Sequence, residues 1–236
     1  MIPKLNDLPK YDLIVPSTGK ECRFRAYTVK EEKVLLLAFE GQDNKQSLKA
    51  IFETVAACCD DTLTMKDLTL YDIQFLFSKI RARSVGETSD LTIKCSECQA
   101  ENIVEIDVDG IKMERAEKTT ARIKISDNIS IQLKHPSFFD IMSSKEVTDD
   151  KNISDILISL AVDSLETIYT ADERVNVKEE PREAAVEFIE SMSRVQFEKI
   201  IEFIGTIPKL AYVADFECVK CKHPNHFEIK DNADFF

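Results

Sequence analysis

LTIKCSECQAENIVEID at residues 91–107 and ADFECVKCKHPNHFEIKD at residues 214–231 are two versions of one pattern. Each has an alternating apolar run, a Cys-x-x-Cys pair, a short polar turn and a second alternating run. Alternation with a period of two is typical of strands, so each stretch predicts a β-hairpin with two thiols at its tip. The architecture therefore depends on whether the two tips meet.

The pairs Cys95/Cys98 and Cys218/Cys221 have the spacing of metal ligands. One Cys-x-x-Cys pair is a weak signal, but two of them on predicted hairpins can complete a tetrahedral four-cysteine site. We therefore predict one structural zinc ion per chain, bound by these four cysteines in a zinc-ribbon-like site. A redox role is disfavoured because a strand follows each pair, whereas a low-pKa thiol would need a helix N-terminus behind it.

The remaining thiols and the nearby histidines have weaker signals. Cys22, Cys58 and Cys59 lack metal-like spacing, so we expect inert thiols in the core. His223 and His226 follow Cys221 and are either polar turn residues or contributors to the metal site, and the sequence leaves this open. If all four cysteines bind, no coordination position remains for a substrate or water, which argues against a catalytic zinc.

Composition excludes several classes of function. The chain has 236 residues, of which 44% are hydrophobic and 31% charged, as in soluble globular proteins. It has no apolar run of about 18 residues and no secretory signal at its start, so we expect no membrane span and a cytoplasmic protein. A net charge of −12 repels phosphate backbones and predicts no nucleic-acid partner. No catalytic constellation is recognisable, so we expect no enzymatic activity.

The order of elements predicts an α+β fold made of helices and several β-hairpins. Hairpins are expected at about residues 10–28, 89–108, 119–134 and 210–236. Helices are expected at about residues 29–40, 44–59, 64–86 with a break near Tyr71, 137–145, 152–169, 181–192 and 193–205. We expect two α+β lobes, at residues 1–110 and 111–236, each ending in one cysteine hairpin and held together by the metal.

The N-terminal part carries a further pattern. PSTGK (16–20), RFRAYTVKEEKVLLLA (23–38) and IRARSVGE (80–87) precede the first cysteine pair in this order. This order, over residues 11–40 and 72–98, resembles the baseplate hub and hub-assembly protein family of contractile-tailed bacteriophages. PSTGK itself is a predicted hairpin turn, since it has only one glycine and lacks the phosphate-loop pattern. The stretches that carry the resemblance are Pro16–Lys20, Val29–Lys33 and Arg81–Glu87.

The resemblance implies a late phage protein that acts without catalysis, as a baseplate hub component or as an assembly chaperone. Its partners would be other tail or baseplate hub proteins, including the tape-measure protein. It would be found in the host cytoplasm during assembly and in the virion tail baseplate. Two alternatives remain: a zinc-ribbon nucleic-acid-binding or transcription-associated factor, and a metal-dependent hydrolase with a site at Cys218, Cys221, His223 and His226.

Overall fold

The computed structural model describes residues 8–41, 43–111, 113, 118–143, 153–209 and 212–229. The chain forms two compact units, and the first is discontinuous in sequence. The first unit comprises Met1–Met65, Tyr71–Arg115 and Lys209–Phe236, and the second comprises Lys66–Leu70 and Ala116–Pro208. The predicted end of the short helix near residue 145, the predicted start of the next helix at residue 152, and the tail at 230–236 lie outside the described residues.

The elements are those of a mixed helix and sheet fold with several small antiparallel hairpins, which confirms the predicted α+β class. The first unit contains β1 (Lys10–Ile14), β2 (Glu21–Arg25), α1 (Val29–Glu40), α2 (Asn44–Cys58), α3 (Leu70–Ser84), β3 (Thr88–Lys94), β4 (Glu101–Asp107), β9 (Tyr212–Glu217) and β10 (Pro224–Ile229). None of the helices in the described part of the chain is long and apolar enough to cross a membrane.

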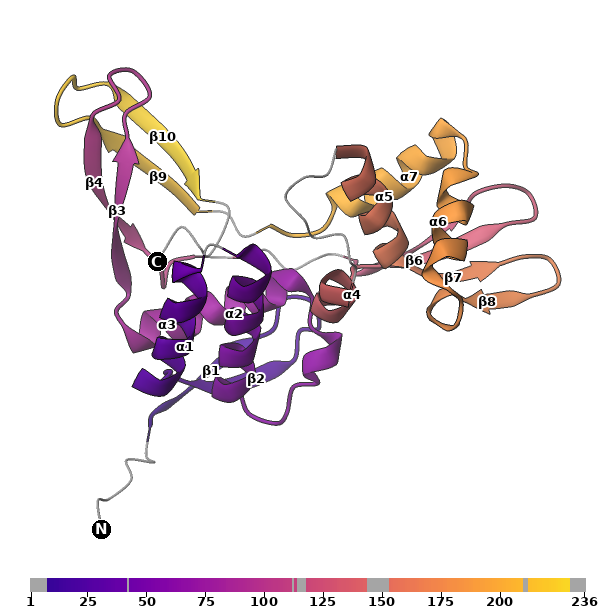
Figure 1. Ribbon diagram of the computed structural model, residues 1–236, viewed down its shortest axis with the longest axis horizontal. Coiled ribbons are helices and arrows are strands. Elements are labelled where there is room, and N and C mark those ends of the chain that lie inside the picture. Colours follow the sequence, from indigo (N-terminus) through magenta and orange to yellow (C-terminus); the bar gives the residue numbers. More distant parts are fainter. Residues whose placement is uncertain are drawn as a thin grey trace, which may run out of the picture. The chain divides into compact units, whose positions relative to one another are not determined.

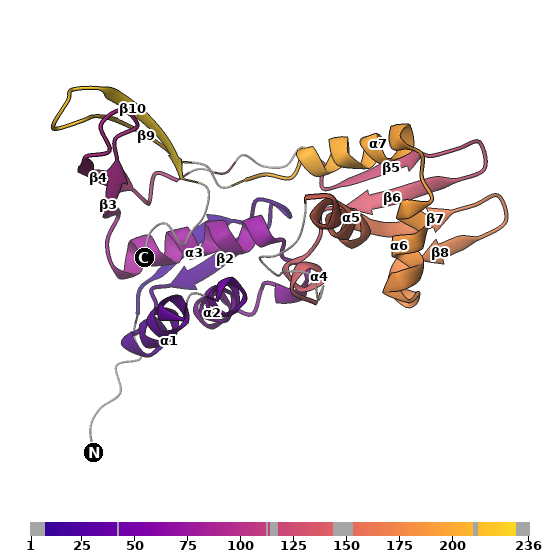
Figure 2. The ribbon, with the colours of Figure 1, turned by 45° about the horizontal axis from the view of Figure 1, so that its top comes forward.

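Local signals explain how the helical part of the first unit begins. Thr28 and Glu31 form the predicted capping box at the start of α1. The side chain of Asp43 accepts hydrogen bonds from the amides of Lys45 and Gln46 and so caps α2. Helices α1 and α2 pack side by side (Figure 2).

The PSTGK stretch is the turn between β1 and β2, as predicted. Gly19 has a φ of 66°, which a glycine adopts without strain. The amide and hydroxyl of Ser17 donate to the carboxylate of Asp72 at 2.9 and 2.6 Å. Because Asp72 lies in the first turn of α3, these hydrogen bonds attach the hairpin turn to that helix.

The second unit is a four-stranded antiparallel sheet, in the order β5-β6-β7-β8, covered on one face by helices (Figure 1). Its elements are β5 (Thr120–Lys124), β6 (Ser130–Lys134), α4 (Phe138–Ser143), α5 (Ile153–Ser164), β7 (Leu165–Tyr169), β8 (Arg174–Asn176), the short helix η2 (Val177–Glu179), α6 (Arg182–Glu190) and α7 (Arg194–Gly205). Ile131 and Leu133 from β6 are fully buried against side chains of α5, α6 and α7. The short helix η1 (Met65–Asp67) spans the position in the sequence where the first unit gives way to the second.

Two elements, β7 and β8, differ from the prediction. The helix expected over residues 152–169 ends at Ser164, and Leu165–Tyr169 form strand β7. Arg174–Asn176, where no strand was predicted, form β8, which pairs with β7 at the edge of the sheet. The segment 165–169 is rich in β-branched and aromatic side chains, and antiparallel pairing with β6 satisfies its backbone groups.

The units also differ from lobes at residues 1–110 and 111–236. After the second unit the chain returns to the first, so both cysteine hairpins belong to the first unit. The hydrophobic cluster that includes Ile106 from β4 and Ala214 from β9 explains this return. The cysteines therefore lie within one unit and do not join two lobes.

Candidate metal centre

The two hairpins bring the four predicted cysteines together. Cys95 and Cys98 lie in the turn between β3 and β4, and Cys218 and Cys221 lie in the turn between β9 and β10. The two hairpins lie side by side (Figure 1). The four Sγ atoms all lie within 4.8 Å of one another. Two contacts join the hairpins: Cys95 to Cys221 and Cys98 to Cys218, each at 3.7 Å. Ligands from segments about 120 residues apart thus form one cluster.

The sulfur separations fit a metal better than a disulfide. Four Zn–S bonds of about 2.3 Å in a tetrahedron would place the sulfurs about 3.8 Å apart. A disulfide would require about 2.05 Å between two sulfurs. The observed 3.7 Å therefore matches the edge of a tetrahedral four-sulfur site. Thiolates are soft donors, and a tetrahedral set of four selects zinc or iron rather than magnesium or calcium.

The two hairpin tips have the same backbone conformation. The amide of Cys95 donates to the carbonyl of Ala100, and the amide of Cys218 donates to that of His223, each at 2.9 Å. The residue after each second cysteine has a positive φ, 57° at Gln99 and 61° at Lys222. This left-handed residue reverses the chain tightly enough for both thiols of a pair to point to one side.

Two asparagines connect the tips reciprocally. Asn102 accepts a hydrogen bond from the amide of Val219 at 2.9 Å, and Asn225 accepts one from the amide of Ser96 at 2.9 Å. Each also donates to a carbonyl two residues earlier in its own hairpin. Both are buried, with exposed fractions of 2% and 8%. Each hairpin thus binds the residue after the first cysteine of the other hairpin.

These asparagines were not predicted as site residues, although the sequence carries a signal for them. Each follows the second cysteine of its own pair by four positions, so the repeated pattern is Cys-x-x-Cys-x-x-x-Asn. Asparagine is uncommon inside strands, and two at one offset indicate a shared role. Asn225 also approaches the Cys95 sulfur, with its amide nitrogen at 3.6 Å, so it contacts the site directly.

Backbone amides favour the thiolate form at the first cysteine of each pair. The amide of Cys98, with that of Glu97, lowers the pKa of the Cys95 thiol. The amide of Cys221, with that of Lys220, lowers the pKa of Cys218 to about 6. For Cys221 the amide of His223 also favours the thiolate, but the Cys98 and Cys218 thiols outweigh it and raise the pKa to about 12.

A small hydrophobic cluster supports the hairpins at their base. Ile106, Val108 and Ile111 are buried with Ala214 and with Ala82 of α3. The hydroxyl of Tyr212 accepts a hydrogen bond from the amide of Asp107 at 3.2 Å. The cysteine hairpins therefore pack on each other and on α3 at the end opposite the thiols.

The other candidate residues do not join the cysteine cluster. His226 pairs through Nδ1 with Asp215 at 2.8 Å, and neither His223 nor His226 belongs to the group of possible ligands. Cys22 and Cys58 are buried, and Cys59 is half-buried. Among the residues that the structure describes, one group of His, Cys, Asp or Glu side chains lies close enough together to hold a metal ion, and it consists of these four cysteines.

The chain matches the family model described as T4 bacteriophage base plate protein over residues 8–236. It belongs to this family. The predicted resemblance to phage baseplate proteins is thereby confirmed. The comparison with curated proteins and the comparison with solved structures each found no match.

The stretches that suggested the resemblance have structural roles in this base plate family member. Pro16–Lys20 includes the hairpin turn that binds Asp72, and Val29–Lys33 begins α1. In Arg81–Glu87, Arg81 is buried and donates to the hydroxyl of Ser89 at 3.0 Å, while Arg83 pairs with Glu87 and with Asp109. Arg83 also stacks on the ring of Tyr11 at 5.2 Å. These stretches thus connect β1, α3 and the first cysteine hairpin.

Proposed function

We propose that this chain is a non-enzymatic component of the phage baseplate hub, or an assembly chaperone for it, and that its four cysteines hold one structural zinc ion. Membership of the base plate family supports an assembly role with other baseplate proteins. The observation that carries the zinc proposal is the set of four sulfurs within 4.8 Å, with contacts of 3.7 Å between the hairpins.

The site suits a structural ion better than a catalytic one. Four thiolates fill a tetrahedral coordination shell, whereas a catalytic zinc keeps a position for water or substrate. Isolated two-stranded hairpins are marginally stable, so an ion that joins two of them contributes directly to folding. The paired hairpins and the four neighbouring sulfurs support the proposal of a zinc-ribbon-like site.

The ion would also cross-link cysteines that are far apart in sequence and so close a long loop of the chain. Cys98 and Cys218 are separated by 120 positions, and the whole second unit lies between them. By chain entropy a cross-link over such a loop is worth about 4–5 kcal/mol of stability. The proposed role of the metal is therefore to hold the returning C-terminal hairpin on the first unit.

Metal analysis tests the centre. Protein purified without chelator should contain about one zinc per chain, and Cys95→Ser and Cys218→Ser should each abolish stoichiometric zinc binding. Cys22→Ser is the matched control, because Cys22 is buried outside the cluster. Metal-free protein, or zinc retained by Cys95→Ser, would contradict the proposal, and the latter would favour a Cys/His site at the second hairpin.

Association tests the assembly role. The chain should co-purify with baseplate hub proteins from infected cells or on co-expression. Its presence in finished particles would identify a hub component, and its absence from them together with binding to assembly intermediates would identify a chaperone. Failure to associate with any tail protein would refute both forms of the proposal.

Zinc-ribbon-like hairpins also suggest a nucleic-acid binder, but the charge of these hairpins opposes it. Their exposed side chains include many carboxylates, namely Asp90, Glu97, Glu101, Glu105, Asp107, Asp215, Glu217 and Glu228. Such a surface repels phosphate backbones. The baseplate proposal is therefore preferred.

A further inference from the structure

The sheet of the second unit has one face that α5, α6 and α7 do not cover. Ala121, Ile131 and Leu133 point into the core beneath α5, α6 and α7, so the alternate positions point to the other side. Those positions are Thr120, Arg122, Lys124, Ser130, Gln132, Lys134, Thr167, Tyr169, Arg174 and Asn176. They include two arginines and two lysines, and Glu166, at the bulge of β7 beside Thr167, is the acidic residue next to them. We call these residues the basic face.

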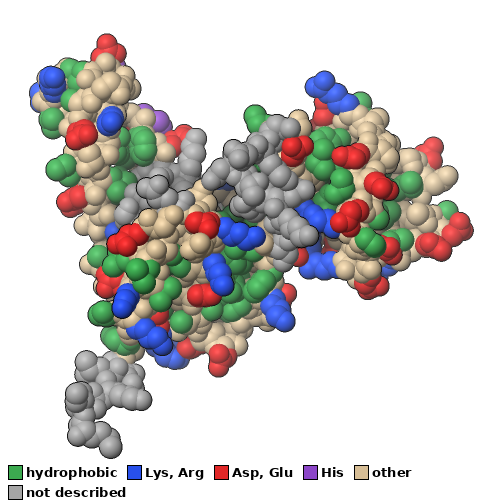
Figure 3. Space-filling view, viewed as in Figure 1, with side chains coloured by type: hydrophobic (Ala, Val, Ile, Leu, Met, Phe, Trp, Pro, Cys, Tyr) green, Lys and Arg blue, Asp and Glu red, His purple; other side chains and the backbone are tan. Residues whose placement is uncertain are grey.

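This face contrasts with the rest of an acidic chain, whose net charge is −12. Acidic side chains are numerous on the view of the second unit that shows its helices (Figure 3). Glu183, Glu187 and Glu190 on α6 and Glu198 and Glu202 on α7 are all exposed. Like charges close together on one sheet face repel each other and weaken it. Four cations with one acidic neighbour on the strands, Glu166, therefore indicate a surface suited to an anionic partner.

Contacts with the ring of Tyr169 position the side chains of Arg122 and Arg174 on the basic face. Both guanidinium groups stack on the ring of Tyr169, at 4.0 and 5.6 Å from its centroid. Lys124 pairs with Asp127 and Lys134 with Asp140, but neither arginine forms an ion pair or side-chain hydrogen bond with any residue the structure describes. A guanidinium binds a carboxylate through two parallel hydrogen bonds. Arg122 and Arg174 can therefore each bind one carboxylate of a partner.

A polar cavity of about 480 Å³ lies at the Arg174 end of the face. Its lining includes Lys66, Lys134, Arg174 and Lys178, with Thr167 buried at 2% exposure. Asp67 and Glu166 also line it and offset part of the positive charge. This volume is in the range of protein ligand pockets. The cavity is therefore large enough for side chains of a docked segment.

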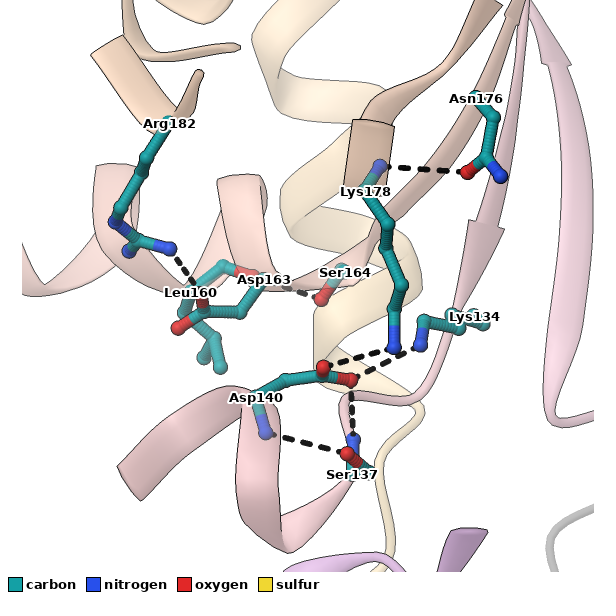
Figure 4. A network of polar contacts seen from close by, with 9 residues as sticks. All are labelled: Lys134, Ser137, Asp140, Leu160, Asp163, Ser164, Asn176, Lys178 and Arg182. Carbon is teal, nitrogen blue, oxygen red and sulfur yellow. Dashed lines mark hydrogen bonds and ion pairs between the residues drawn. The ribbon is translucent and has the colours of Figure 1, made fainter. Parts of the chain in front are cut away.

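Asp140 shows how a carboxylate is held beside this cavity. Lys134 and Lys178 contact its two oxygens at 2.9 and 3.0 Å, and the amide of Ser137 donates at 3.1 Å (Figure 4). Both lysines point toward the carboxylate from different elements, β6 and η2. Carboxylate recognition by convergent cations is therefore already present at this end of the face.

We propose that the basic face docks an extended acidic segment of another protein, whose Asp or Glu side chains pair with Arg122 and Arg174. A nucleic acid is disfavoured because the guanidinium groups stack on Tyr169, which limits base stacking, and the surrounding unit is acidic. The proposed assembly role says only that such a partner is a baseplate protein. Binding itself does not depend on the metal centre, which lies in the first unit.

Peptide binding to the full-length protein tests this. The probe is a short fluorescent peptide rich in Glu and Asp, and its control is the same peptide with Gln and Asn in their place. At about 50 mM salt, where screening is weak, the acidic peptide should bind by fluorescence anisotropy and weaken as salt rises. Arg122→Gln with Arg174→Gln should reduce affinity roughly tenfold or more.

Arg194→Gln is the matched control, since it removes an exposed cation from α7, where Arg194 pairs with Glu198. This variant should bind as the wild type does. Arg122→Lys with Arg174→Lys keeps the charge and should retain part of the affinity, which separates lost contacts from misfolding. Equal binding of the acidic and neutral peptides, or wild-type affinity in the double Gln variant, would overturn the proposal. Tighter binding of a single-stranded oligonucleotide through the same arginines would also overturn it, in favour of nucleic acid.

Discussion

Glu31 combines a helix cap with an ion pair. It accepts hydrogen bonds from Arg25 at 2.7 and 3.2 Å and from the amide of Thr28 at 2.6 Å. The hydrogen bonds from Arg25 and then from Thr28 lower its pKa from 4.5 to about 2, although burial opposes them. A carboxyl whose pKa is lower in the folded state stabilises the fold above its unfolded pKa. That stabilisation is lost as the pH falls from about 4.5 to about 2.

Glu31→Gln should therefore lower the free energy of unfolding of the first unit by about 1.5–3 kcal/mol at neutral pH. The difference from the wild type should shrink as the pH falls through this range, as measured by urea denaturation at several pH values. Glu40→Gln, an exposed change on the same helix, should alter stability by less than about 0.5 kcal/mol. A difference that stays constant with pH would contradict this account.

Asn102 and Asn225 position the metal ligands through the backbone. Asn102→Ala leaves the buried amide of Val219 without its acceptor, and Asn225→Ala does the same at Ser96. If the centre binds zinc, each change should weaken zinc affinity about 10–100-fold in competition with a chromogenic chelator. Asn128→Ala, an exposed loop change, should have no effect. Unchanged affinity in both hairpin variants would show that the asparagines support only the fold.

At the scale of elements, β7 shows that the spacing of hydrophobic residues does not by itself distinguish a strand from a helix. Leu165 and Ile168 fit the apolar stripe of a helix that continues from α5, and they also fit one face of a strand when a bulge intervenes. Only pairing with β6, more than thirty positions earlier in the chain, favours the strand. Local patterns therefore determined that these residues are buried but not which element buries them.

Leu165→Ala tests the burial of β7 in the core, because Leu165 is buried opposite Leu133 in the sheet. The change should destabilise the second unit by about 2–5 kcal/mol in thermal or urea unfolding. Val195→Ala on α7, where the side chain is 68% exposed, is the matched apolar truncation and should cost far less. Equal losses in the two variants would mean that Leu165 is not in the core.

At the scale of the whole molecule, the first unit is completed by a segment that follows the second unit in sequence. Strands β9 and β10 return to pack on β4, and the cysteines and asparagines join the hairpins at the other end. Bringing β9 and β10 back to β4 closes a long loop, and closing that loop costs conformational entropy. The returning hairpin therefore depends on cross-hairpin contacts for its place.

Metal removal should accordingly act locally. After treatment with a chelator, amides of β9 and β10 should exchange hydrogen faster, while amides of β5–β8 in the second unit should keep their protection. Hydrogen exchange measured by mass spectrometry resolves the two regions. Uniform loss of protection, or none in the cysteine hairpins, would contradict a metal that holds the returning hairpin.

Much of the molecule follows from local signals in the sequence. The capping box at Thr28, the turn at Pro16–Lys20 and the alternation around each Cys-x-x-Cys pair predicted their elements because those signals act over a few residues. The four cysteines were predicted as one cluster because a tetrahedral site needs four donors. Asn102 and Asn225 were missed because their role is a contact between hairpins.

The sequence by itself determined the α+β class, the baseplate resemblance and the four thiols that come together. Only the tertiary structure decided that the second hairpin belongs to the first unit, that residues 165–169 are a strand, and that one sheet face gathers cations such as Arg122 and Arg174. The physical reason is the separation in sequence over which each kind of interaction acts. Caps, turns and strand alternation depend on neighbours in sequence, whereas sheet partners, unit boundaries and surface charge depend on residues that only folding brings together.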